Sequence, residues 1–595
     1  MTRSVTSMRG TNRSAARRQA RLPGKAMDKA WLAGRRGARI NDAVVKSILT
    51  MVDQSGIVDE IAAWRAQDRV GKHPGGRPAT VGDRAVLVLL MVLANECSPI
   101  QYTRMTDLVM TRMSGSALAA IGIASRPVDD RVAYNRIWRA VRSLLDVIEP
   151  FSGPRNRLLT RDEYERLRDG RDPEVSDAKR DRLDRVSNWI VEVSVRQLDP
   201  GVLSHYLGNL CIDATLVETF GVGRGDKSPF VSSEPDAAFY VREGDHRYPG
   251  DGSGKRVKYG YGYEAHLAVM GDNDPGATTA GRFPKLVLGM RLDKPGFDIA
   301  GNAMSVLRSI HGRGYPAKYL AADRAYLPGC KADELQLPLR ALGYEPVFDY
   351  KEDQLGIKDA YEGAILVEGA FYCPQMPGPL VDATLDYRKG DIDEAQWKQR
   401  IAQRRSYAFR RKAKPDPDGY VPMMCPACGP NATAICPLKQ VVGSPAGRTK
   451  VRIGPGPHPK VCTNVASVTF PPAAGAKYRQ PLRFGTNEWQ DTYSTLRNTI
   501  EGFNGYLKDT AYSGLGQRTK FRMRGFAAHS INVALAVFAS NLRKIASFEA
   551  AERDLADGEQ EQGTVPRTRR PRRRDTLLKF TVTPDELHSG DPPAA

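Results

Sequence analysis

The order of strands and helices predicted after Leu203 constrains the fold more than any other feature of this sequence. A short apolar strand is followed by two longer strands, and then by a helix, a strand, a helix and a final strand. The expected strands are 210–212, 258–270, 285–292, 318–322 and 345–350, and the expected helices are 298–311 and 329–342. Successive strands favour hairpins, whereas crossovers through helices favour parallel neighbours. We therefore expect an α/β fold built on a mixed sheet.

Two aspartates directly follow predicted strands. Asp213 comes after Cys-Ile, and Asp323 comes after Leu-Ala-Ala. Functional side chains in open α/β sheets gather at the carboxyl ends of strands, where the backbone is rigid and the side chain faces a crevice. Aspartate at a strand end is also a common turn residue. Glu218, Glu264 and Asp298 are competing acids that the sequence alone does not exclude.

A third acid lies on a helix predicted over 493–508. At about 100° per residue, Tyr493, Arg497, Glu501 and Lys508 fall at roughly 0°, 40°, 80° and 60° on the helical wheel. A neighbouring apolar stripe consists of Leu496, Ile500, Phe503 and Leu507. The helix should thus bury one stripe and present the other. Taken alone, Arg497 and Glu501 could be an ordinary surface ion pair of small energetic value.

Together these residues fit metal-dependent chemistry on phosphate. Asp213, Asp323 and Glu501 could hold two divalent ions about 3.5 to 4 Å apart, which is the arrangement used for in-line displacement at phosphorus. Mg²⁺ prefers oxygen ligands and keeps several waters, so it needs few protein groups. Arg497 and Lys508 can offset phosphate charge, and Arg497 is suited to bidentate contact.

Charge points to a polyanionic partner. The chain has 88 Lys plus Arg against 68 Asp plus Glu, a net charge of +20 and a pI of about 9.5. Cations that neutralise phosphates release counterions, which favours nucleic acid, although a generically basic protein remains the alternative. Basic residues concentrate in 1–40 and 567–574. We expect both ends to be disordered until they meet phosphate.

The segment 41–150 should form a helical DNA-binding domain. Its expected third helix, 129–148, carries aromatic residues among arginines: Arg131, Tyr134, Arg136, Trp138, Arg139 and Arg142. A short turn before a basic helix fits a domain of helix-turn-helix type. The alternative is an all-helical packing domain whose arginines are only solvated.

The stretch 351–487 is dense in Pro, Gly, Cys and basic residues, and we interpret it as an insertion into the sheet domain. Cys425 and Cys428 form a Cys-Pro-Ala-Cys pair, followed by Cys436 and Cys462, with Cys373 upstream. Thiolates at such spacing can hold a tetrahedral Zn²⁺, and a loop-rich subdomain would gain stability from it. Ordinary reduced cysteines are the alternative.

Several of these motifs together resemble a known family, the bacterial insertion-sequence transposases with a DDE catalytic domain. The resemblance rests on C-I-D-A-T at Asp213, Y-G-Y-E-A-H-L-A-V from Tyr259, A-A-D-R-A-Y at Asp323, and the Tyr, Arg, Glu, Lys signature around Glu501. It covers approximately 203–545. One departure is that three residues separate Tyr493 from Arg497, where the family signature usually has two.

The resemblance implies a fold and an activity. The fold would be a ribonuclease H-like mixed sheet with a cysteine-containing insertion, preceded by an all-helical N-terminal domain. Asp213, Asp323 and Glu501 would bind two Mg²⁺ or Mn²⁺ ions, and Tyr493, Arg497 and Lys508 would contact DNA. The enzyme would cut double-stranded DNA at terminal inverted repeats and join the freed 3′ hydroxyl to target DNA, acting as a homodimer.

The expected organisation has seven parts. These are a basic disordered arm (1–40), a helical DNA-binding domain (41–150), a helical connector (151–200), the first part of the catalytic core (201–350), the insertion (351–487), the second part of the core with the glutamate helix (488–548) and a disordered basic tail (549–595). Apolar runs are too short to span a bilayer, so we expect no membrane contact and a cytoplasmic, nucleoid-associated protein. The functional alternatives are a catalytically silent, transposase-derived DNA-binding protein and a ribonuclease H-like nuclease.

Overall fold

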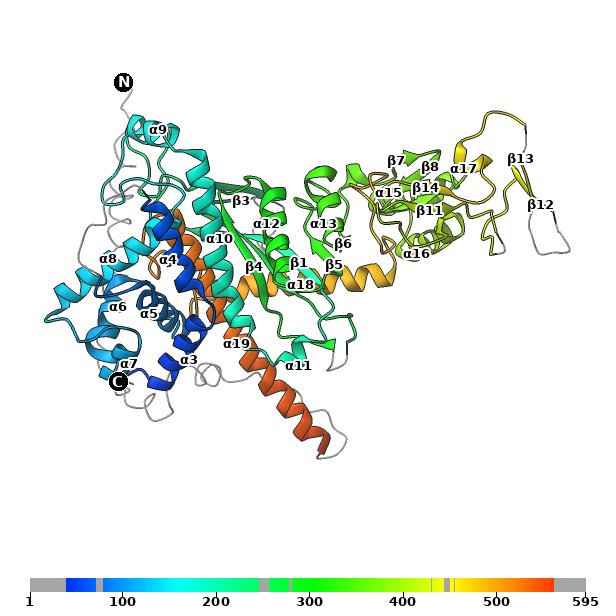
Figure 1. The fold of residues 1–595 in the computed structure, drawn as a ribbon. Coiled ribbons are helices and arrows are strands. Elements are labelled where there is room, and N and C mark those ends of the chain that lie inside the picture. The colour runs from blue at the N-terminus through cyan, green and yellow to red at the C-terminus, as the bar shows by residue number, and fades with distance from the viewer. Residues whose placement is uncertain are drawn as a thin grey trace, which may run out of the picture. The chain divides into compact units, whose positions relative to one another are not determined.

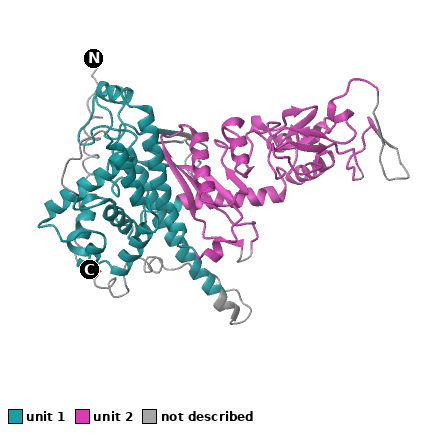
Figure 2. Ribbon diagram, viewed as in Figure 1, with its two compact units in different colours: residues 1–198, 216–265, 505–595 teal, residues 199–215, 266–504 magenta. Residues whose placement is uncertain are grey.

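The computed structural model describes residues 39–70, 79–244, 256–277, 281–429, 431–442, 450–453 and 455–560 (Figure 1). The basic arm, except its last two residues, and the chain after residue 560 lie outside this part. The chain divides into two compact units (Figure 2). Unit 1 comprises 1–198, 216–265 and 505–595, and unit 2 comprises 199–215 and 266–504.

Unit 1 is mainly helical. Its helices are α3 (Asp42–Asp53), α4 (Ile57–Asp68), α5 (Asp83–Asn95), α6 (Tyr102–Asp107), α7 (Gly115–Ala120), α8 (Asp130–Ile148), α9 (Arg161–Asp169), α10 (Pro173–Val195) and α19 (Phe526–Gln560), with a π-helical turn at Leu108–Arg112. Every residue of α5 from Ala85 onward is buried, which makes this apolar helix the centre of the unit. Helices α10 and α19 pack side by side, and α19 also contacts α5 (Figure 1).

Local backbone chemistry sets the helix boundaries in unit 1. Two separate helices, α3 and α4, form over 42–68, because Gly56 adopts a φ of +73° immediately before α4. Helix α8 confirms the prediction for 129–148, since the Asp129 side chain accepts a hydrogen bond from the Val132 amide at 2.7 Å and caps the helix. Helix α19 continues to Gln560, past the expected start of the tail.

A six-stranded mixed sheet confirms the expected α/β class. Its strands are β1 (Leu210–Glu218), β2 (Ala238–Gly244), β3 (Arg256–Met270), β4 (Val287–Asp293), β5 (Tyr319–Ala322) and β6 (Glu345–Val347). The order is β2-β3-β1-β5-β6, and β4 also pairs with β3. Strands β1, β5 and β6 run parallel, whereas β2 is antiparallel to β3. Strand β2 was not predicted, and the division into units passes through β1 and β3.

Helices of unit 2 follow the predicted crossovers. Helix α12 (Ile299–Gly312) packs on β4 and turns its apolar side chains inward. The helix expected over 329–342 consists of a π-helical turn (Ala332–Gln336) followed by α13 (Leu337–Ala341). These two crossovers return the chain to the parallel neighbours β5 and β6, as the pattern predicts.

The segment 351–487, which was expected to be an insertion, has more regular structure than its composition indicates. Besides α14 (Gly378–Val381), α15 (Ala383–Lys389), α16 (Glu394–Gln403) and α17 (Lys460–Thr463), it contains β7 (Ile357–Tyr361), β8 (Ala364–Val367), β9 (Ala370–Tyr372), β10 (Arg410–Arg411), β11 (Val421–Met424), β12 (Lys439–Val442), β13 (Lys450–Ile453) and β14 (Val468–Phe470). Two three-stranded sheets and a hairpin result. The rings of Phe371 and Phe470 meet edge to face with centroids 4.8 Å apart in their shared core.

Helix α18 (Asn487–Lys508) confirms the predicted glutamate helix and begins six residues earlier than expected. All members of its apolar stripe are buried: Leu496, Ile500, Phe503 and Leu507. The neighbouring stripe of Tyr493, Arg497 and Glu501 is therefore the one available for chemistry, as the amphipathic pattern indicates.

Candidate active site

The register between two parallel strands brings the two predicted aspartates together. Strands β1 and β5 pair with Cys211 opposite Ala321 and Ile212 opposite Ala322. Asp323 directly follows β5 as predicted, but β1 runs on to Glu218, so Asp213 lies within the strand and not at its end. It is the residue next to Ile212 along β1. Since neighbouring strands lie about 4.8 Å apart, the two acids stand side by side at this edge of the sheet. Both belong to unit 2.

Arg497 of α18 lies among the acids. Its Nη1 atom is 3.9 Å from Asp213 Oδ1, and its Nη2 atom donates to Glu501 Oε1 at 3.2 Å. Burial disfavours the charged guanidinium, but the attraction of Asp213 and, more weakly, of Asp323 raises the pKa of Arg497 above its ordinary value. The positive charge of one guanidinium thus offsets the negative charge of all three predicted acids.

Arg497 also has spare bonding capacity. Its Nη1 atom is buried and makes no hydrogen bond to any described residue. A buried donor without an acceptor costs free energy unless a ligand or water supplies one. This N–H group is therefore suited to an oxygen of a bound anion.

Glu501 lies one helical turn beyond Arg497, and its side chain is 61% exposed. Its carboxylate is held by Arg497. Among the described residues, no group of three or more His, Cys, Asp or Glu side chains is close enough to hold one metal ion. Helix α18 supplies the third acid to this region, but the Glu501 carboxylate is not close enough to the two aspartates for all three to bind one ion.

Asn504 is a site residue that the sequence pattern did not reveal to us. Its Nδ2 atom donates to Asp213 Oδ2 at 3.3 Å, and its buried Oδ1 atom has no partner among the described residues. Asn504 falls at roughly 20° on the same helical wheel, inside the stripe between Tyr493 and Glu501. The helical pattern therefore marks this position, although asparagine has neither the charge nor the aromatic ring that distinguishes the other members of the stripe.

Aromatic packing fixes the start of the reactive stripe. The Tyr493 ring stacks on Trp489 with centroids 5.3 Å apart and an interplanar angle of 13°. Burial raises the pKa of Tyr493 to about 12, so its hydroxyl remains a neutral donor at physiological pH. Burial also raises the pKa of the Cys211 thiol, two residues before Asp213, which keeps this sulfur uncharged beside the acids.

Lys508 is the last residue of α18 and belongs to unit 1, whereas Tyr493, Arg497 and Glu501 of the same helix belong to unit 2. The contacts that define the site lie within unit 2. The role of Lys508 on DNA therefore stays a prediction from the sequence.

The three acids that compete with Asp213 and Asp323 in the sequence each occupy a different place in the fold. Glu218 pairs with Arg518 at 3.0 Å within unit 1. Asp298 precedes α12 and accepts a hydrogen bond from the Gly301 amide at 3.0 Å, which caps that helix. Glu264 is buried within β3. Glu218 is the last residue of β1, five positions beyond Asp213, whereas Glu264 and Asp298 belong to β3 and to the cap of α12.

The cysteines predicted to bind zinc share one core of the insertion. Cys425, Cys428 and Cys462 are buried there, and Cys436 packs against them. Lys439 Nζ lies 3.2 Å from Cys428 Sγ. The Cys428 hydrogen bond, assisted by the Lys439 charge, lowers the pKa of the Cys425 thiol. The four thiols share this core, but among the described residues no three of them are close enough to hold one metal ion, and the Lys439 ammonium lies beside the Cys-Pro-Ala-Cys pair.

No model of a known protein family matches this chain, and no curated protein matches its sequence. Within the described residues, no helix is both long enough and apolar enough to cross a membrane.

Proposed function

We propose that the chain is a DNA transposase that cleaves DNA at the ends of a mobile element and joins the freed 3′ hydroxyl to target DNA. One observation carries this proposal. Asp213 and Asp323 follow paired positions of adjacent parallel strands, and Arg497 of α18 lies against Asp213 while holding Glu501. Three acids distant in the sequence are thereby linked through one cation.

The chemistry of the donors suits a hard divalent cation, and the three carboxylates would have to close around the ion from their present spacing. Asp213, Asp323 and Glu501 offer carboxylate oxygens, the ligand type that Mg²⁺ and Mn²⁺ prefer. When bound, a pair of such ions activates the attacking oxygen and stabilises the leaving oxygen at phosphorus. The three acids would hold these ions, and a bound cation would compete with Arg497 for them.

The remaining side chains have roles on the DNA. The buried Nη1 donor of Arg497 would bind a phosphate oxygen next to Asp213. Asn504 would hold Asp213 in its present orientation. Tyr493, braced by Trp489, would donate a hydrogen bond or stack against the nucleotide at the cleavage point.

The sheet supports the finer fold assignment within this proposal. If β2 is set aside as an added hairpin strand, the order becomes β4-β3-β1-β5-β6, with β1, β5 and β6 parallel. The first acid is then on the first strand, the second follows the fourth strand, and the glutamate follows a long insertion. This plan agrees with the ribonuclease H-like plan implied by the sequence resemblance.

Charge-neutral variants test the proposal. Asp213→Asn, Asp323→Asn and Glu501→Gln should each reduce Mg²⁺-dependent cleavage and joining by at least about a thousandfold, because each removes a carboxylate from the metal site. Binding to the same DNA should change little. Gel assays of strand cleavage and strand transfer, with anisotropy for binding, measure both quantities.

Asp298→Asn is the matched control, because it makes the same chemical change in the same unit and asparagine caps a helix as well as aspartate. This variant should keep full activity. Full strand transfer by any of the three site variants would refute the assignment. Cleavage without joining in the unmodified chain would instead favour the nuclease, and binding without cleavage would favour the silent DNA-binding protein.

A further inference from the structure

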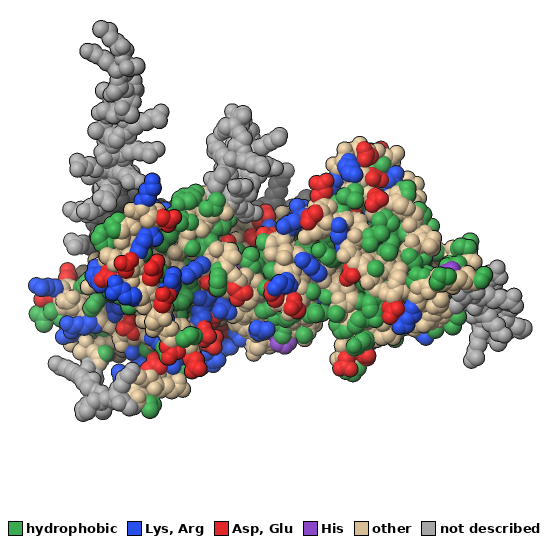
Figure 3. Space-filling view, turned by 90° about the horizontal axis from the view of Figure 1, so that it is seen from above, with side chains coloured by type: hydrophobic (Ala, Val, Ile, Leu, Met, Phe, Trp, Pro, Cys, Tyr) green, Lys and Arg blue, Asp and Glu red, His purple; other side chains and the backbone are tan. Residues whose placement is uncertain are grey.

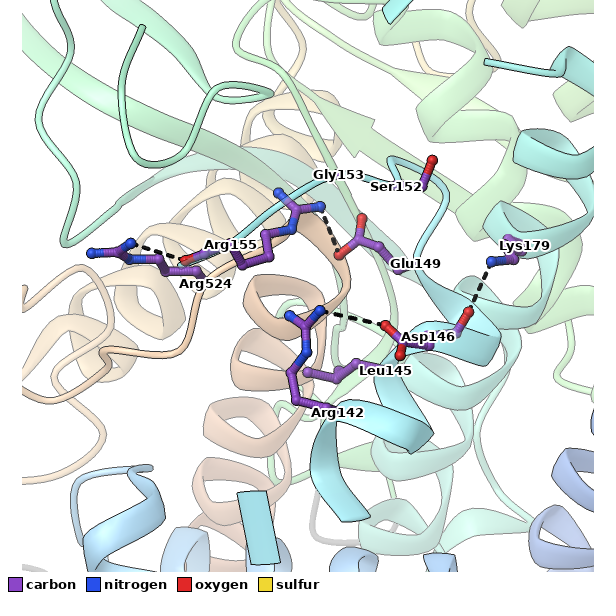
Figure 4. Close-up of a pocket in the computed structure, with 9 residues that line it drawn as sticks. All are labelled: Arg142, Leu145, Asp146, Glu149, Ser152, Gly153, Arg155, Lys179 and Arg524. Atoms are coloured by element: carbon purple, nitrogen blue, oxygen red, sulfur yellow. Dashed lines mark hydrogen bonds and ion pairs between the residues drawn. The ribbon is translucent and has the colours of Figure 1, made fainter. Parts of the chain in front are cut away.

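Two hollows in unit 1 border helix α8, and they differ in whether their basic side chains have partners in the protein. The smaller encloses about 200 Å³ and is lined by Arg142, Leu145, Asp146, Glu149, Ser152, Gly153, Arg155, Lys179 and Arg524 (Figure 4). Its basic side chains already form ion pairs or hydrogen bonds within the protein. Arg142 pairs with Asp146 at 3.6 Å, and Arg155 pairs with Glu149 at 3.3 Å. Lys179 and Arg524 donate to the backbone carbonyls of Asp146 and Arg155, so each of the four cations already has an acceptor within the protein.

The larger hollow, which we call the α4–α8 hollow, encloses about 640 Å³. Its lining comprises Arg65, Arg69, Ala79, Thr80, Val81, Gly82, Asp83, Arg136, Arg139, Ala140 and Ser143. Four arginines therefore surround it, two from α4 and its C-terminal cap and two from α8, against one carboxylate. Like charges held around one cavity repel one another unless an anion joins them.

Only one of these arginines is neutralised by the described part of the chain. Arg65 donates to both oxygens of Asp83, at 3.0 and 2.7 Å, and to Ser143 Oγ at 2.7 Å. No described residue forms a hydrogen bond or an ion pair with the side chains of Arg69, Arg136 or Arg139. On the face shown in Figure 3, Lys and Arg side chains are interspersed with Asp and Glu. Three arginines without acidic partners among the described residues therefore line one hollow.

The neighbouring surface of α8 matches a nucleic acid. Arg131, Asn135, Trp138 and Arg142 recur at intervals of four, three and four residues and so form one ridge along the helix, which we call the α8 ridge. Trp138 is 43% exposed, although it is a large aromatic side chain. Exposed aromatic and basic side chains together suit the bases and backbone of nucleic acid.

We infer that the α4–α8 hollow binds a backbone phosphate of duplex DNA, with Arg69, Arg136 and Arg139 as its donors and the α8 ridge lying along the same duplex. Arginine suits this role, because its planar fork of N–H groups matches two phosphate oxygens. The choice of DNA as the polyanion rests on the proposed function, whereas the preference for a phosphate group follows from the hollow itself.

Salt titration of DNA binding tests this inference. The variant Arg69→Gln with Arg139→Gln removes two unpartnered cations and leaves the Arg65–Asp83 pair intact. Each phosphate contact contributes about 0.9 to the slope of log affinity against log salt concentration. The slope of this variant for a duplex oligonucleotide should be smaller than that of the unmodified chain by about one to two, measured by fluorescence anisotropy.

The matched control is Arg157→Gln with Arg185→Gln. This pair of substitutions removes the same charge from exposed positions of unit 1, but Arg157 is paired with Glu163 and Arg185 with Glu60. Its slope should equal that of the unmodified chain. Circular dichroism of both variants verifies that the helices remain folded.

The outcomes separate the possibilities. Equal slopes for the two double variants, with tight binding by the unmodified chain, would overturn the hollow as a DNA site and leave the proposed function standing. Inorganic phosphate that shifts the NMR signals of α8 without any change in the DNA slope would point to a free-anion site and would also overturn it. A reduced slope with unchanged Mg²⁺-dependent cleavage at saturating DNA would support a contact separate from the chemistry.

Discussion

At the scale of single residues, the candidate site depends on how charge is balanced around Arg497. The guanidinium forms ion pairs with Asp213 and Glu501 and is also attracted by the charge of Asp323. It therefore stabilises all three carboxylates, although they are too far apart to bind a single ion in this arrangement. Asn504 adds a neutral donor to Asp213. This arrangement predicts competition between the internal cation and an added divalent ion for the same carboxylates.

Replacing Arg497 tests that competition. Arg497→Gln should lower the free energy of unfolding by about 1–3 kcal/mol, because partly buried acids lose their cation. Added Mg²⁺ should then stabilise the variant more than the unmodified chain, since the ion meets less competition. Thermal melts with and without Mg²⁺ measure both effects.

Arg400→Gln provides the comparison, because Arg400 pairs with Asp386 in the segment 351–487 of the same unit. Its response to Mg²⁺ should match that of the unmodified chain. Equal Mg²⁺ shifts for Arg497→Gln and Arg400→Gln would show that Arg497 does not compete with a metal ion.

At the scale of elements, the helices and strands that could be predicted from the sequence are those whose hydrophobic pattern repeats over several turns or strands. The wheel of α18 assigned its buried stripe correctly, and the alternation of strands and crossover helices gave the parallel trio β1, β5 and β6. The strand-end rule then pointed to Asp213 and Asp323. Their pairing register could not be predicted, because register depends on contacts across strands that no local pattern records.

The insertion was harder to predict for a physical reason. Its strands are two to five residues long, and β7 is exposed at four of its five positions, so alternation cannot be recognised. Its core instead depends on contacts distant in sequence. Arg404, for example, is buried with Glu368 at 2.5 Å and also donates to the Leu380 carbonyl. Strand β2 was missed because only its pairing with β3 defines it.

The apolar stripe of α18 gives a second prediction. Ile500 is fully buried, so Ile500→Ala should lower the free energy of unfolding by about 2–5 kcal/mol through lost burial and a residual cavity. Asn498→Ala, a change at an exposed polar position on the same helix, should alter it by less than about 1 kcal/mol. Urea denaturation monitored by circular dichroism measures the difference. A small effect at Ile500 would mean that α18 does not pack through this face.

The cysteine core of the insertion gives a third prediction. We propose that Cys425, Cys428, Cys436 and Cys462 bind one Zn²⁺, which would replace the charge balance now supplied by Lys439. Purified protein should contain about one zinc per chain by elemental analysis. Cys425→Ser should lose the metal, and Cys330→Ser, outside the insertion, should keep it. Protein with no stoichiometric zinc would rule out the site.

At the scale of the whole molecule, the two units carry different parts of the proposed activity. The three acids and Arg497 belong to unit 2, whereas the α4–α8 hollow and the α8 ridge belong to unit 1. The net charge of +20 suits both parts to a polyanion. Variants in one unit should therefore change chemistry without binding, and variants in the other should change binding without chemistry.

The proposed activity depends above all on Asp213, Asp323 and Glu501 binding the same divalent ions. Iron(II) in place of Mg²⁺, with ascorbate and peroxide, generates hydroxyl radicals that cut the chain next to the bound metal, and mass spectrometry locates the cuts. We predict cuts near residues 213, 323 and 501 together, all suppressed by excess Mg²⁺ and absent from Asp213→Asn. Cuts near one of these positions alone, or cuts spread evenly along the chain, would contradict a shared metal site.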